Sequence, residues 1–317
     1  MENRQTLTMR SRPYLLKVTK TLRYHWQQAV RGYRSTVWPF VKPHYSDCVF
    51  IVGCSRSGTT LIYKTLSLAR ELASLNRETH AFWNSLHPPA ENDWADHILT
   101  EQNVTPQERA RVFKYFYLSL GNRPFVDKAN QNGFRIGYLN ALFPNARFLF
   151  VKRDGPDNIH SLIQGWHRPA EYGDWSEHLP AHVAVDQGHF TRWCFFLYPG
   201  WRDDLHAPIE QVCANQWSSI NEAILTAKAT IPSPQWIEVA YEDLLRQPVA
   251  AFRDLFAALG LHFEEDIEHH CSTVIERPYN AFSKPRLNKW REAENADKIE
   301  TILPKIASIR ERLGYSC

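Results

Sequence analysis

The feature that most constrains the fold is the run CVFIVGCSRSGTT, which occupies residues 48–60. A buried apolar strand would lead into a turn with glycines at Gly53 and Gly58, and residues 61–75 then show a helix-like pattern. In this arrangement successive backbone N–H groups and a helix N-terminus converge on an anion. The spacing nearly fits the GxxxxGK(S/T) pattern of triphosphate-binding loops, but Thr59 occupies the lysine position. We therefore expect a loop that binds a phosphorylated donor other than a nucleoside triphosphate.

From residue 47 onward, apolar runs of strand length alternate with helical patterns. This alternation is typical of a parallel sheet whose strands are joined by crossover helices. We expect strands at Cys48–Val52, around Leu72–Leu75, and at Pro124–Val126, Arg147–Val151 and Trp236–Val239. We expect helices at Thr59–Glu71, Asn132–Leu142, Asp157–Gln164, Val212–Ala229 and Pro248–Leu259. The predicted fold class is α/β: a single domain at residues 46–317 with a central, mainly parallel sheet, a P-loop-like phosphate loop and helices on both faces.

Residues 1–45 differ from the rest of the chain in charge and aromatic content. They carry nine Lys or Arg residues against one acid, and aromatic residues at positions 14, 24, 26, 33, 38 and 40. One interpretation is an amphipathic arm that rests on an anionic membrane surface or on a partner. The other is an ordinary helix packed on the domain, with its charges in water. A second distinct segment, residues 168–208, is rich in Trp, His and Pro and predicts an insertion that covers a site.

Composition excludes several classes of protein. The net charge is +3, and because residues 1–45 are basic the remainder is slightly acidic, so no nucleic-acid-binding surface is expected. The chain has no run of about 18 apolar residues, which predicts no membrane span, and no apolar stretch of a secretory signal follows its first basic residues. The six cysteines show no CxxC pair and no metal-ligand spacing. This favours reduced thiols in a cytoplasm and predicts no metal site.

Polar residues follow each predicted strand at the point where it ends. These residues are Gly53–Thr60, Asn76–His80, Asp127 with Lys128, Lys152–Gly155 and Tyr241–Asp243. In open parallel sheets, ligands bind beyond the carboxyl ends of the strands. Arg, Lys, Glu and Tyr side chains should therefore meet at one edge of the sheet, around the anion-binding turn. That combination suits transfer of a charged group from a phosphorylated donor.

Four segments of the chain form a specific combination when taken in order. They are SRSGTT in residues 55–60, FPNARFLFVKRDGPDNIHSLI in 143–163, YEDLLRQP in 241–248 and LNKW in 287–290. Together they resemble the superfamily of sulfotransferases that use 3′-phosphoadenosine 5′-phosphosulfate (PAPS), most closely its tyrosylprotein and carbohydrate branches, over residues 49–290. The resemblance implies transfer of a sulfuryl group from PAPS to an acceptor hydroxyl, or less favourably an amine, with release of the nucleotide PAP. The alternative is a P-loop kinase-like phosphotransferase, which Thr59 and the lack of a clear acidic magnesium site disfavour.

The resemblance implies that one loop binds the 5′-phosphosulfate, through Arg56, Ser57, Gly58, Thr59 and Thr60. Glycine at position 58 permits close backbone approach, while hydroxyl and N–H groups take the phosphate oxygens. Arg56 would contact the bridging or sulfuryl oxygens, where negative charge develops as the bond to sulfur breaks.

The resemblance places the 3′-phosphate site on Arg153 and Ser161. A guanidinium at a strand end and a hydroxyl two turns into the next helix can hold one phosphate from two sides. Relatives often have an arginine four residues beyond the serine, where this chain has Gly165, and Arg168 is a candidate replacement. Two further residues match positions that approach the nucleotide from its far side: Tyr241 and Lys289.

For catalysis, the acceptor must lose a proton as it attacks sulfur. Glu78 matches the base of the tyrosylprotein-like branch, and His80 is the competing base, because histidine serves in other branches and its ordinary pKa is nearer neutrality. We expect partial burial to raise the Glu78 pKa. Lys128 matches a lysine that lies against the transferring group. Asp154 would orient the guanidinium of Arg153 or cap the following helix.

The resemblance limits the acceptor less than the donor. It points to a glycan or glycolipid, or to a small natural product, with the aromatic residues 166–201 as the acceptor wall by position. Nothing in the chain resembles the membrane anchor and stem of Golgi tyrosylprotein enzymes, so a protein tyrosine acceptor is not expected. A cytoplasmic enzyme with peripheral membrane contact through residues 1–45 is the expected setting, and the scheme requires no metal.

Overall fold

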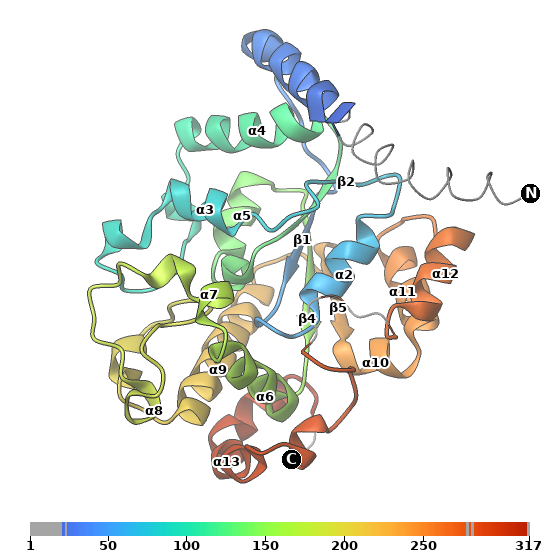
Figure 1. The fold of residues 1–317 in the computed structure, drawn as a ribbon. Coiled ribbons are helices and arrows are strands. Elements are labelled where there is room, and N and C mark those ends of the chain that lie inside the picture. Colours follow the sequence, from blue (N-terminus) through green and yellow to red (C-terminus); the bar gives the residue numbers. More distant parts are fainter. Residues whose placement is uncertain (1–20, 23, 277–278, 280–281, 316–317) are drawn as a thin grey trace, which may run out of the picture. The chain divides into compact units, whose positions relative to one another are not determined.

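The computed structural model describes the whole chain except residues 1–20, 23, 277–278, 280–281 and 316–317 (Figure 1). It divides into two compact units. The sheet unit comprises residues 45–104 and 124–317, and the arm unit comprises residues 1–44 and 105–123. Each unit is described separately below. The predicted domain boundary at residues 45–46 lies next to this division and stays a prediction.

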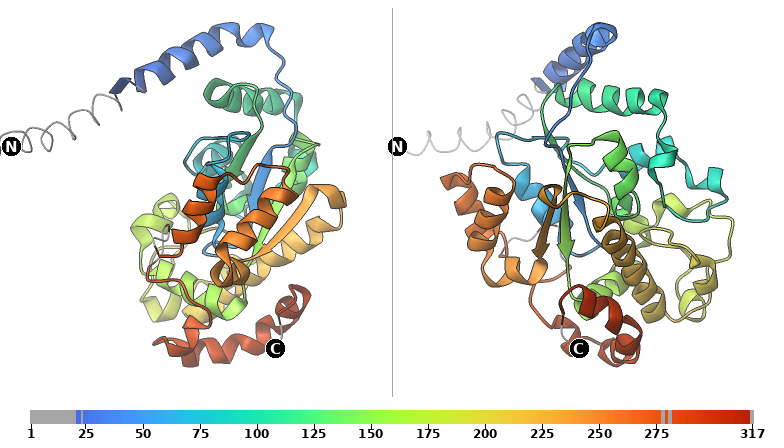
Figure 2. Two further views of the ribbon diagram at one scale, coloured as in Figure 1. Left: turned by 90° about the vertical axis from the view of Figure 1, so that its right-hand side faces the viewer. Right: turned by 180° about the vertical axis from the view of Figure 1, so that it is seen from behind.

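A five-stranded, all-parallel sheet forms the centre of the sheet unit, which confirms the predicted fold class (Figures 1 and 2). The strand order is β2-β3-β1-β4-β5. The strands are β1 (Val49–Val52), β2 (Ala73–Ser74), β3 (Phe125–Lys128), β4 (Arg147–Lys152) and β5 (Trp236–Ala240). All five lie at the predicted places. Because the apolar run of β1 is buried on both faces, it can occupy the middle of the sheet, between β3 and β4.

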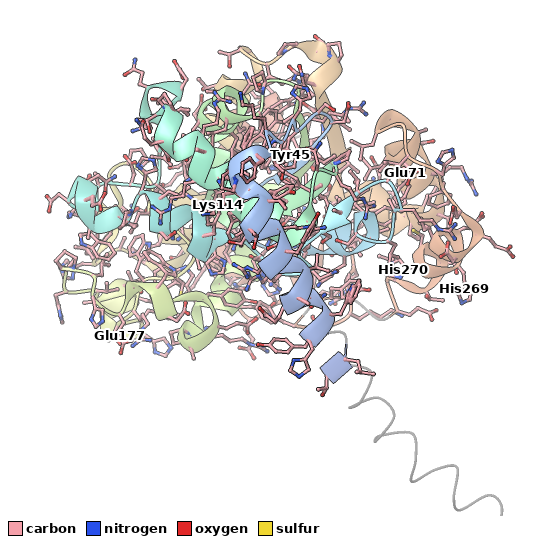
Figure 3. The ribbon with its side chains drawn as sticks, turned by 90° about the horizontal axis from the view of Figure 1, so that it is seen from above. Tyr45, Glu71, Lys114, Glu177, His269 and His270 are labelled. Atoms are coloured by element: carbon pink, nitrogen blue, oxygen red, sulfur yellow. The ribbon has the colours of Figure 1, made fainter. Side chains whose placement is uncertain are left out.

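Alternate residues of β1 build the two halves of the core. Val49 and Ile51 belong to a hydrophobic cluster that also contains residues of helices α2 (Thr59–Leu66), α11 (Pro248–Ala258) and α12 (Glu265–Thr273). Phe50 points to the other face, where its ring centroid lies 5.3–6.4 Å from those of four other aromatic residues: Trp83, Phe125, Phe143 and Phe148. On the side of Val49 and Ile51, α12 packs against α2, where His270 Nε2 lies 3.3 Å from Thr65 Oγ1. Figure 3 labels His270 on α12.

The helices of the sheet unit differ from the predicted ranges mainly at their ends. The expected helix 59–71 ends at Leu66, and the expected helix 132–142 begins only at Ile136, after the 3₁₀ turn η4 (Asn130–Phe134). Two other predicted helices begin a few residues earlier than expected, α6 (Gly155–Trp166) and α9 (Ile209–Lys228), and α11 ends one residue earlier than expected. The predicted helix that begins at Ile136 is α5 (Ile136–Leu142). The sequence did not predict α3 (His80–Leu86), α10 (Tyr241–Arg246), α12 or α13 (Ala296–Arg312).

Residues 168–208, the predicted insertion, contain short elements joined by loops. These are α7 (Pro169–Tyr172), η5 (Asp174–Ser176), α8 (Val185–Gly188) and η6 (Trp201–Asp204). Most of its aromatic side chains are buried, including Trp193, Phe196 and Trp201. The segment is therefore chiefly an extension of the core and not a loose cover. The remaining 3₁₀ turns of the unit are η2 (Pro89–Asn92), η3 (Glu101–Asn103), η7 (Ser233–Gln235) and η8 (Lys289–Glu292).

The arm unit is helical. Residues 24–37 form a helix that runs into η1 (Trp38–Phe40), and α4 (Pro106–Leu120) is the second helix. The ring centroids of Trp38 and Tyr117 lie 5.6 Å apart, so the two helices contact one another. Several apolar side chains of the arm nevertheless face solvent, among them Trp26 at 71% and Tyr33 at 69% exposure. Within the part of the chain that the structure describes, no helix is both long and apolar enough to cross a membrane.

Candidate active site

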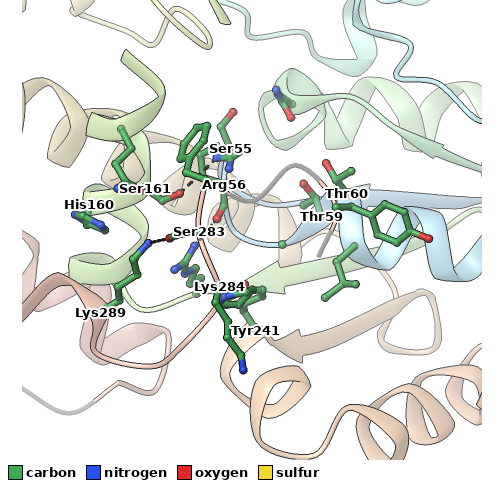
Figure 4. A pocket seen from close by; sticks show the side chains of 18 of the residues that line it. Ser55, Arg56, Thr59, Thr60, His160, Ser161, Tyr241, Ser283, Lys284 and Lys289 are labelled. Atoms are coloured by element: carbon green, nitrogen blue, oxygen red, sulfur yellow. Dashed lines mark hydrogen bonds between the residues drawn. The ribbon is translucent and has the colours of Figure 1, made fainter. Parts of the chain in front are cut away.

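A cavity that opens to solvent lies at the carboxyl ends of the strands, and its empty space, open solvent included, is about 940 Å³. Each of the five predicted strand-end segments contributes to it, as the parallel topology requires. All predicted site residues line it except Ser57 and His80. Ser55, His160 and Ser283, which sequence reasoning did not single out, also line it (Figure 4), as does Phe282. Tyr172 and Phe195 line it as members of the aromatic stretch 166–201 that was expected at the acceptor wall. Ser55 and His160 lie within the motifs quoted above, whereas Phe282 and Ser283 carry no local signal.

The phosphate loop between β1 and α2 has a backbone that suits an anion. Gly58, the residue before α2, has a φ of 99°, in the left-handed region that favours glycine. A Cβ atom at this position would lie 2.3 Å from Cδ2 of Tyr241, so the ring of Tyr241 also requires glycine there. No side chain caps the N-terminus of α2. The first N–H groups of this helix are therefore left for a ligand, as at other phosphate-binding loops.

Three buried polar atoms around the loop lack a hydrogen-bond partner among the described residues. They are Ser55 Oγ, Ser57 Oγ and Arg153 Nε. Buried donors without partners are costly, on the order of 1–3 kcal/mol each. A phosphate group accepts hydrogen bonds from hydroxyl and guanidinium donors together. These residues therefore fit a phosphorylated ligand of the kind that the sequence predicts.

Arg153 and Arg56 connect the loop to α6. Arg153 donates from Nη1 to the backbone oxygen of Arg56 at 2.7 Å, and its guanidinium lies 4.5 Å from the ring centroid of Tyr241. Arg56 donates from Nε to Ser161 Oγ at 3.4 Å and from Nη1 to the Tyr172 hydroxyl at 2.9 Å. The structure thus brings the two predicted phosphate sites into direct contact. Burial lowers the pKa of Arg56.

Position 165 shows why the expected second arginine is absent from α6. A Cβ atom on Gly165 would lie 2.4 Å from Cζ of Phe195, whose ring occupies the space that a side chain there would need. Arg168 was the candidate replacement, but it does not line the cavity. Its guanidinium lies over the ring of Phe282, 4.3 Å from the centroid, while Arg56 lies 4.2 Å from the same centroid.

Asp154 takes the second of its two predicted roles. Its Oδ1 accepts a hydrogen bond from the Gly155 N–H at 2.8 Å and so caps α6. The carboxylate does not orient Arg153; it forms a bidentate pair with Arg310 on α13, at 2.8 and 3.1 Å. This pair ties the C-terminal helix to the start of α6.

Asp157 positions the predicted nucleotide residue Lys289. The two oxygens of its carboxylate accept the backbone N–H groups of Asn288 and Trp290, at 2.8 and 3.0 Å. These are the residues on either side of Lys289, whose Nζ contacts Ser283 Oγ. Lys289 therefore reaches the cavity from a segment that α6 itself holds in place (Figure 4).

Glu78 and Lys128 form an ion pair on the other side of the loop. Lys128 Nζ lies 2.6 Å from Glu78 Oε1 and 3.4 Å from Thr60 Oγ1. The expected raised pKa of Glu78 is wrong. Burial does act to raise that pKa, but the attraction of Lys128 and its hydrogen bond outweigh burial, so the Glu78 pKa lies below its ordinary value. Glu78 is thus an ionised carboxylate at neutral pH, which a proton acceptor must be.

His80, the competing base, begins α3 outside the cavity lining. Its Nδ1 lies 3.9 Å from Glu78 Oε2, and 44% of its side chain is exposed. The structure thus brings Glu78 and Lys128 to the phosphate loop, whereas His80 contributes only through Glu78. Among the described residues, no group of three or more His, Cys, Asp or Glu side chains could hold a metal ion.

This parallel α/β fold, with a phosphate loop, a second cationic subsite and an ionised carboxylate in one cavity, defines a group-transfer enzyme. The model of the Sulfotransferase family matches residues 48–265 of the chain. The chain belongs to this family, and it is a PAPS-dependent sulfotransferase. Because the chain belongs to the Sulfotransferase family, the alternative of a P-loop kinase-like phosphotransferase is wrong.

Individual relatives agree with this assignment. Protein-tyrosine sulfotransferase 2 of Gallus gallus is 25% identical over 292 residues, which cover 84% of this chain and 69% of the relative. Protein-tyrosine sulfotransferase A of Caenorhabditis elegans is 22% identical over 93% of this chain and 73% of its own length. Among solved structures, sulfotransferase STF9 from Mycobacterium avium has the same fold. It has a TM-score of 0.53 at 13% identity, covering 89% of this chain and 81% of that one.

Proposed function

We propose that the protein transfers the sulfuryl group of PAPS to a hydroxyl, or an amine, of a glycan, a glycolipid or a small natural product, and releases PAP. The observation that carries the proposal is the shared cavity. The Glu78–Lys128 pair, the phosphate loop and the Arg153–Ser161 subsite all line it. A base, an anion cradle and a second phosphate site are the parts that transfer from a doubly phosphorylated donor requires.

In this proposal the two phosphate sites divide the donor between them. The loop residues 56–60 hold the 5′-phosphosulfate with N–H groups and hydroxyls, and Thr59 and Thr60, which line the cavity, supply hydroxyls for its oxygens. Arg153 and Ser161 hold the 3′-phosphate, with Lys289 closing over it. Tyr241 lies between the two sites, against both Gly58 and Arg153.

The chemical step is an in-line displacement at sulfur. The acceptor oxygen forms a bond to sulfur as the bond from sulfur to the bridging phosphate oxygen breaks. The acceptor proton passes to Glu78, and the electron pair of the broken bond remains on PAP. Lys128, 3.4 Å from Thr60 of the loop, would stabilise the charge that develops on that bridging oxygen. Arg56 would assist from the opposite side of the loop.

The choice of acceptor rests on four side chains that line the cavity. Tyr172 and Phe195 line it together with the polar residues Asn130 and Gln164. Flat aromatic faces beside amide groups suit a sugar ring or a polycyclic alcohol, which present apolar faces and hydroxyl edges. A second candidate is the phenol of a tyrosine in a protein. The names of the two relatives above favour it.

One experiment tests the reaction and the acceptor together. The purified full chain is incubated with sulfur-labelled PAPS and one acceptor at a time: an oligosaccharide, a glycolipid, a small alcohol or a tyrosine peptide. Label transfer with equal formation of PAP supports the proposal, and the best acceptor identifies the class. Magnesium-ATP and PAP are compared as stabilising ligands in thermal unfolding. Stabilisation by magnesium-ATP alone, without label transfer, would overturn the proposed reaction.

We also propose a cytoplasmic setting with peripheral membrane contact through the arm. Five cysteines are buried thiols outside any disulfide among the described residues, which suits a reducing compartment. The exposed Trp26 and Tyr33, together with the basic residues of the arm, suit an anionic lipid surface. Fractionation of cells that express the chain tests both points.

A further inference from the structure

His160 lines the cavity but has no part in the reaction described so far. It is the residue before Ser161 on α6, and only 5% of it is exposed. Its Nε2 atom is buried and lacks a hydrogen-bond partner among the described residues. A buried polar atom without a partner in a ligand cavity indicates a missing ligand atom, because leaving it unpaired costs about as much as a lost hydrogen bond.

The hydrogen bond of the other ring nitrogen, Nδ1, determines whether Nε2 donates or accepts. Nδ1 lies 2.8 Å from Oδ1 of Asn295, the residue that precedes α13. A carbonyl oxygen only accepts, so the proton of the neutral ring is on Nδ1, and Nε2 carries a lone pair. Burial lowers the pKa of His160 and outweighs the hydrogen bond with Asn295, which raises it; the charge of Lys289 also lowers this pKa. Nε2 therefore accepts a hydrogen bond and needs a donor from the ligand.

PAPS offers two kinds of neutral donor in its nucleoside part: the 2′-hydroxyl of the ribose and the amino group of the adenine. The 2′-hydroxyl is on the carbon next to the one that bears the 3′-phosphate. Because Ser161 is assigned to that phosphate, and His160 is its neighbour in the same cavity beside Lys289, the hydroxyl is the donor within reach (Figure 4). The adenine amino group lies at the far edge of the base.

We infer that Nε2 of His160 accepts a hydrogen bond from the 2′-hydroxyl of the donor's ribose, so that His160 selects ribonucleotide donors. The inference rests on the proposed 3′-phosphate site. It makes Asn295 a positioning residue, because its side-chain oxygen holds the ring in the tautomer that accepts. Sequence reasoning missed the residue because a histidine inside a helix carries no signal of its own.

The test compares two ligands that differ by one oxygen atom. PAP and 2′-deoxy-PAP are titrated into the wild-type protein and into His160→Leu and His160→Gln by calorimetry. We expect the wild type to bind PAP about tenfold more tightly than its deoxy analogue, the size of one neutral hydrogen bond. His160→Leu should abolish this preference, and His160→Gln, whose amide oxygen can accept, should restore part of it. His167→Leu, at the end of the same helix but outside the cavity lining, is the matched control and should keep the preference.

Two outcomes would overturn the inference and a third would overturn its basis. Equal affinity of the wild type for both ligands shows that the 2′-hydroxyl is not recognised, while the proposed function stands. A uniform loss of affinity for both ligands in His160→Leu shows a merely structural role. If the wild type binds neither ligand, the donor assignment itself is wrong. The first comparison needs no variant, so it is informative even if the substitutions impair folding.

Discussion

The ring of Tyr241 fills the space that any side chain at position 58 would need, since a Cβ atom there would lie 2.3 Å from Cδ2. The helix start after β5 and the phosphate loop after β1 are thus fitted to one another. The same ring also receives the guanidinium of Arg153 at 4.5 Å. One tyrosine therefore contacts both the loop and the cation that we propose to bind the 3′-phosphate.

Gly58→Ala should damage the donor site more than an ordinary glycine substitution. The added methyl group must displace Tyr241, and the φ of 99° strains any other residue. We expect the free energy of unfolding to fall by about 1–3 kcal/mol, the usual cost of overpacking, and PAP affinity to fall at least tenfold. Calorimetry and chemical denaturation measure both. Gly32→Ala is the control, because a Cβ atom there meets nothing within 4 Å. Equal losses of stability and PAP affinity in the two variants would show that the contact between Gly58 and Tyr241 does not matter.

Arg153→Ala should weaken binding of PAP by about 1.5–3 kcal/mol, the range for a charge-assisted hydrogen bond. It should barely change the weak binding of adenosine 5′-phosphosulfate, which lacks the 3′-phosphate. Arg168→Ala is the matched control, since that guanidinium lies on Phe282 outside the cavity lining. Equal losses for the two ligands in Arg153→Ala would show that this residue does not bind the 3′-phosphate.

Glu78→Gln should leave donor affinity intact while turnover falls about 10²–10⁴-fold, the range for loss of a general base. The substitution keeps the shape of the side chain and removes its ability to take a proton. His80→Asn should cost much less, because His80 lies outside the cavity lining. Steady-state kinetics with the best acceptor, together with PAP titrations, separate the two effects. Near-normal turnover of Glu78→Gln with an inactive His80→Asn would assign the base to the histidine.

The pH dependence should follow the lowered pKa of Glu78. Because Lys128 holds this pKa below the ordinary 4.5, the carboxylate stays ionised at neutral pH. The stability that the pair contributes is present above the unfolded-state pKa and is lost as the pH falls through the folded-state value. Lys128→Met removes the largest effect that lowers this pKa and leaves only the smaller ones of His80 and Arg56 against burial, so the pKa of Glu78 should rise. Carbon NMR titration of labelled glutamate checks this. Lys64→Met, which replaces a half-buried lysine on α2 that donates to the backbone oxygen of Asn76, should leave the titration of Glu78 unchanged.

The arm should bind anionic vesicles through its exposed aromatic residues. Trp26 and Tyr33 are seven residues apart, on one side of a helix, and both are more than two-thirds exposed. Replacing both with serine should reduce co-sedimentation with phosphatidylserine vesicles several-fold, and added salt should reduce binding of the wild type. Leu68→Ser, an exposed apolar residue of the sheet unit, is the control. Unchanged vesicle binding in the double variant would contradict a lipid-facing arm.

The sequence predicts the sheet and its ligand edge well because both follow from local patterns. A short, continuous apolar run such as Val49–Val52 indicates a central strand, and parallel strands bring their carboxyl ends to one edge of the sheet. Glu78 and Lys128 could therefore be placed at the same edge from different segments. The lowered pKa of Glu78 could not be predicted, because it depends on the 2.6 Å contact between Lys128 Nζ and Glu78 Oε1, which outweighs burial.

Contacts between distant segments account for most of what the sequence did not predict. Gly165 is explained only by the ring of Phe195, and Asp154 pairs with Arg310 instead of Arg153 because α13 returns to the start of α6. Helix α13 itself was missed, and it contains Pro304, which the pattern of a helix normally excludes. The lone pair of His160 likewise depends on Asn295, a residue far along the chain.

The carboxylate of Asp157, which fixes the backbone on both sides of Lys289, also has a consequence for the order of assembly. The two partners are separated by more than 130 residues of sequence. During synthesis, the strands and helices that carry Arg153 and Ser161 leave the ribosome long before residue 289 does, and early segments of a chain begin to fold first. The nascent protein thus has its phosphate loop before it has the segment that carries Lys289, and the cavity is complete only in the finished chain.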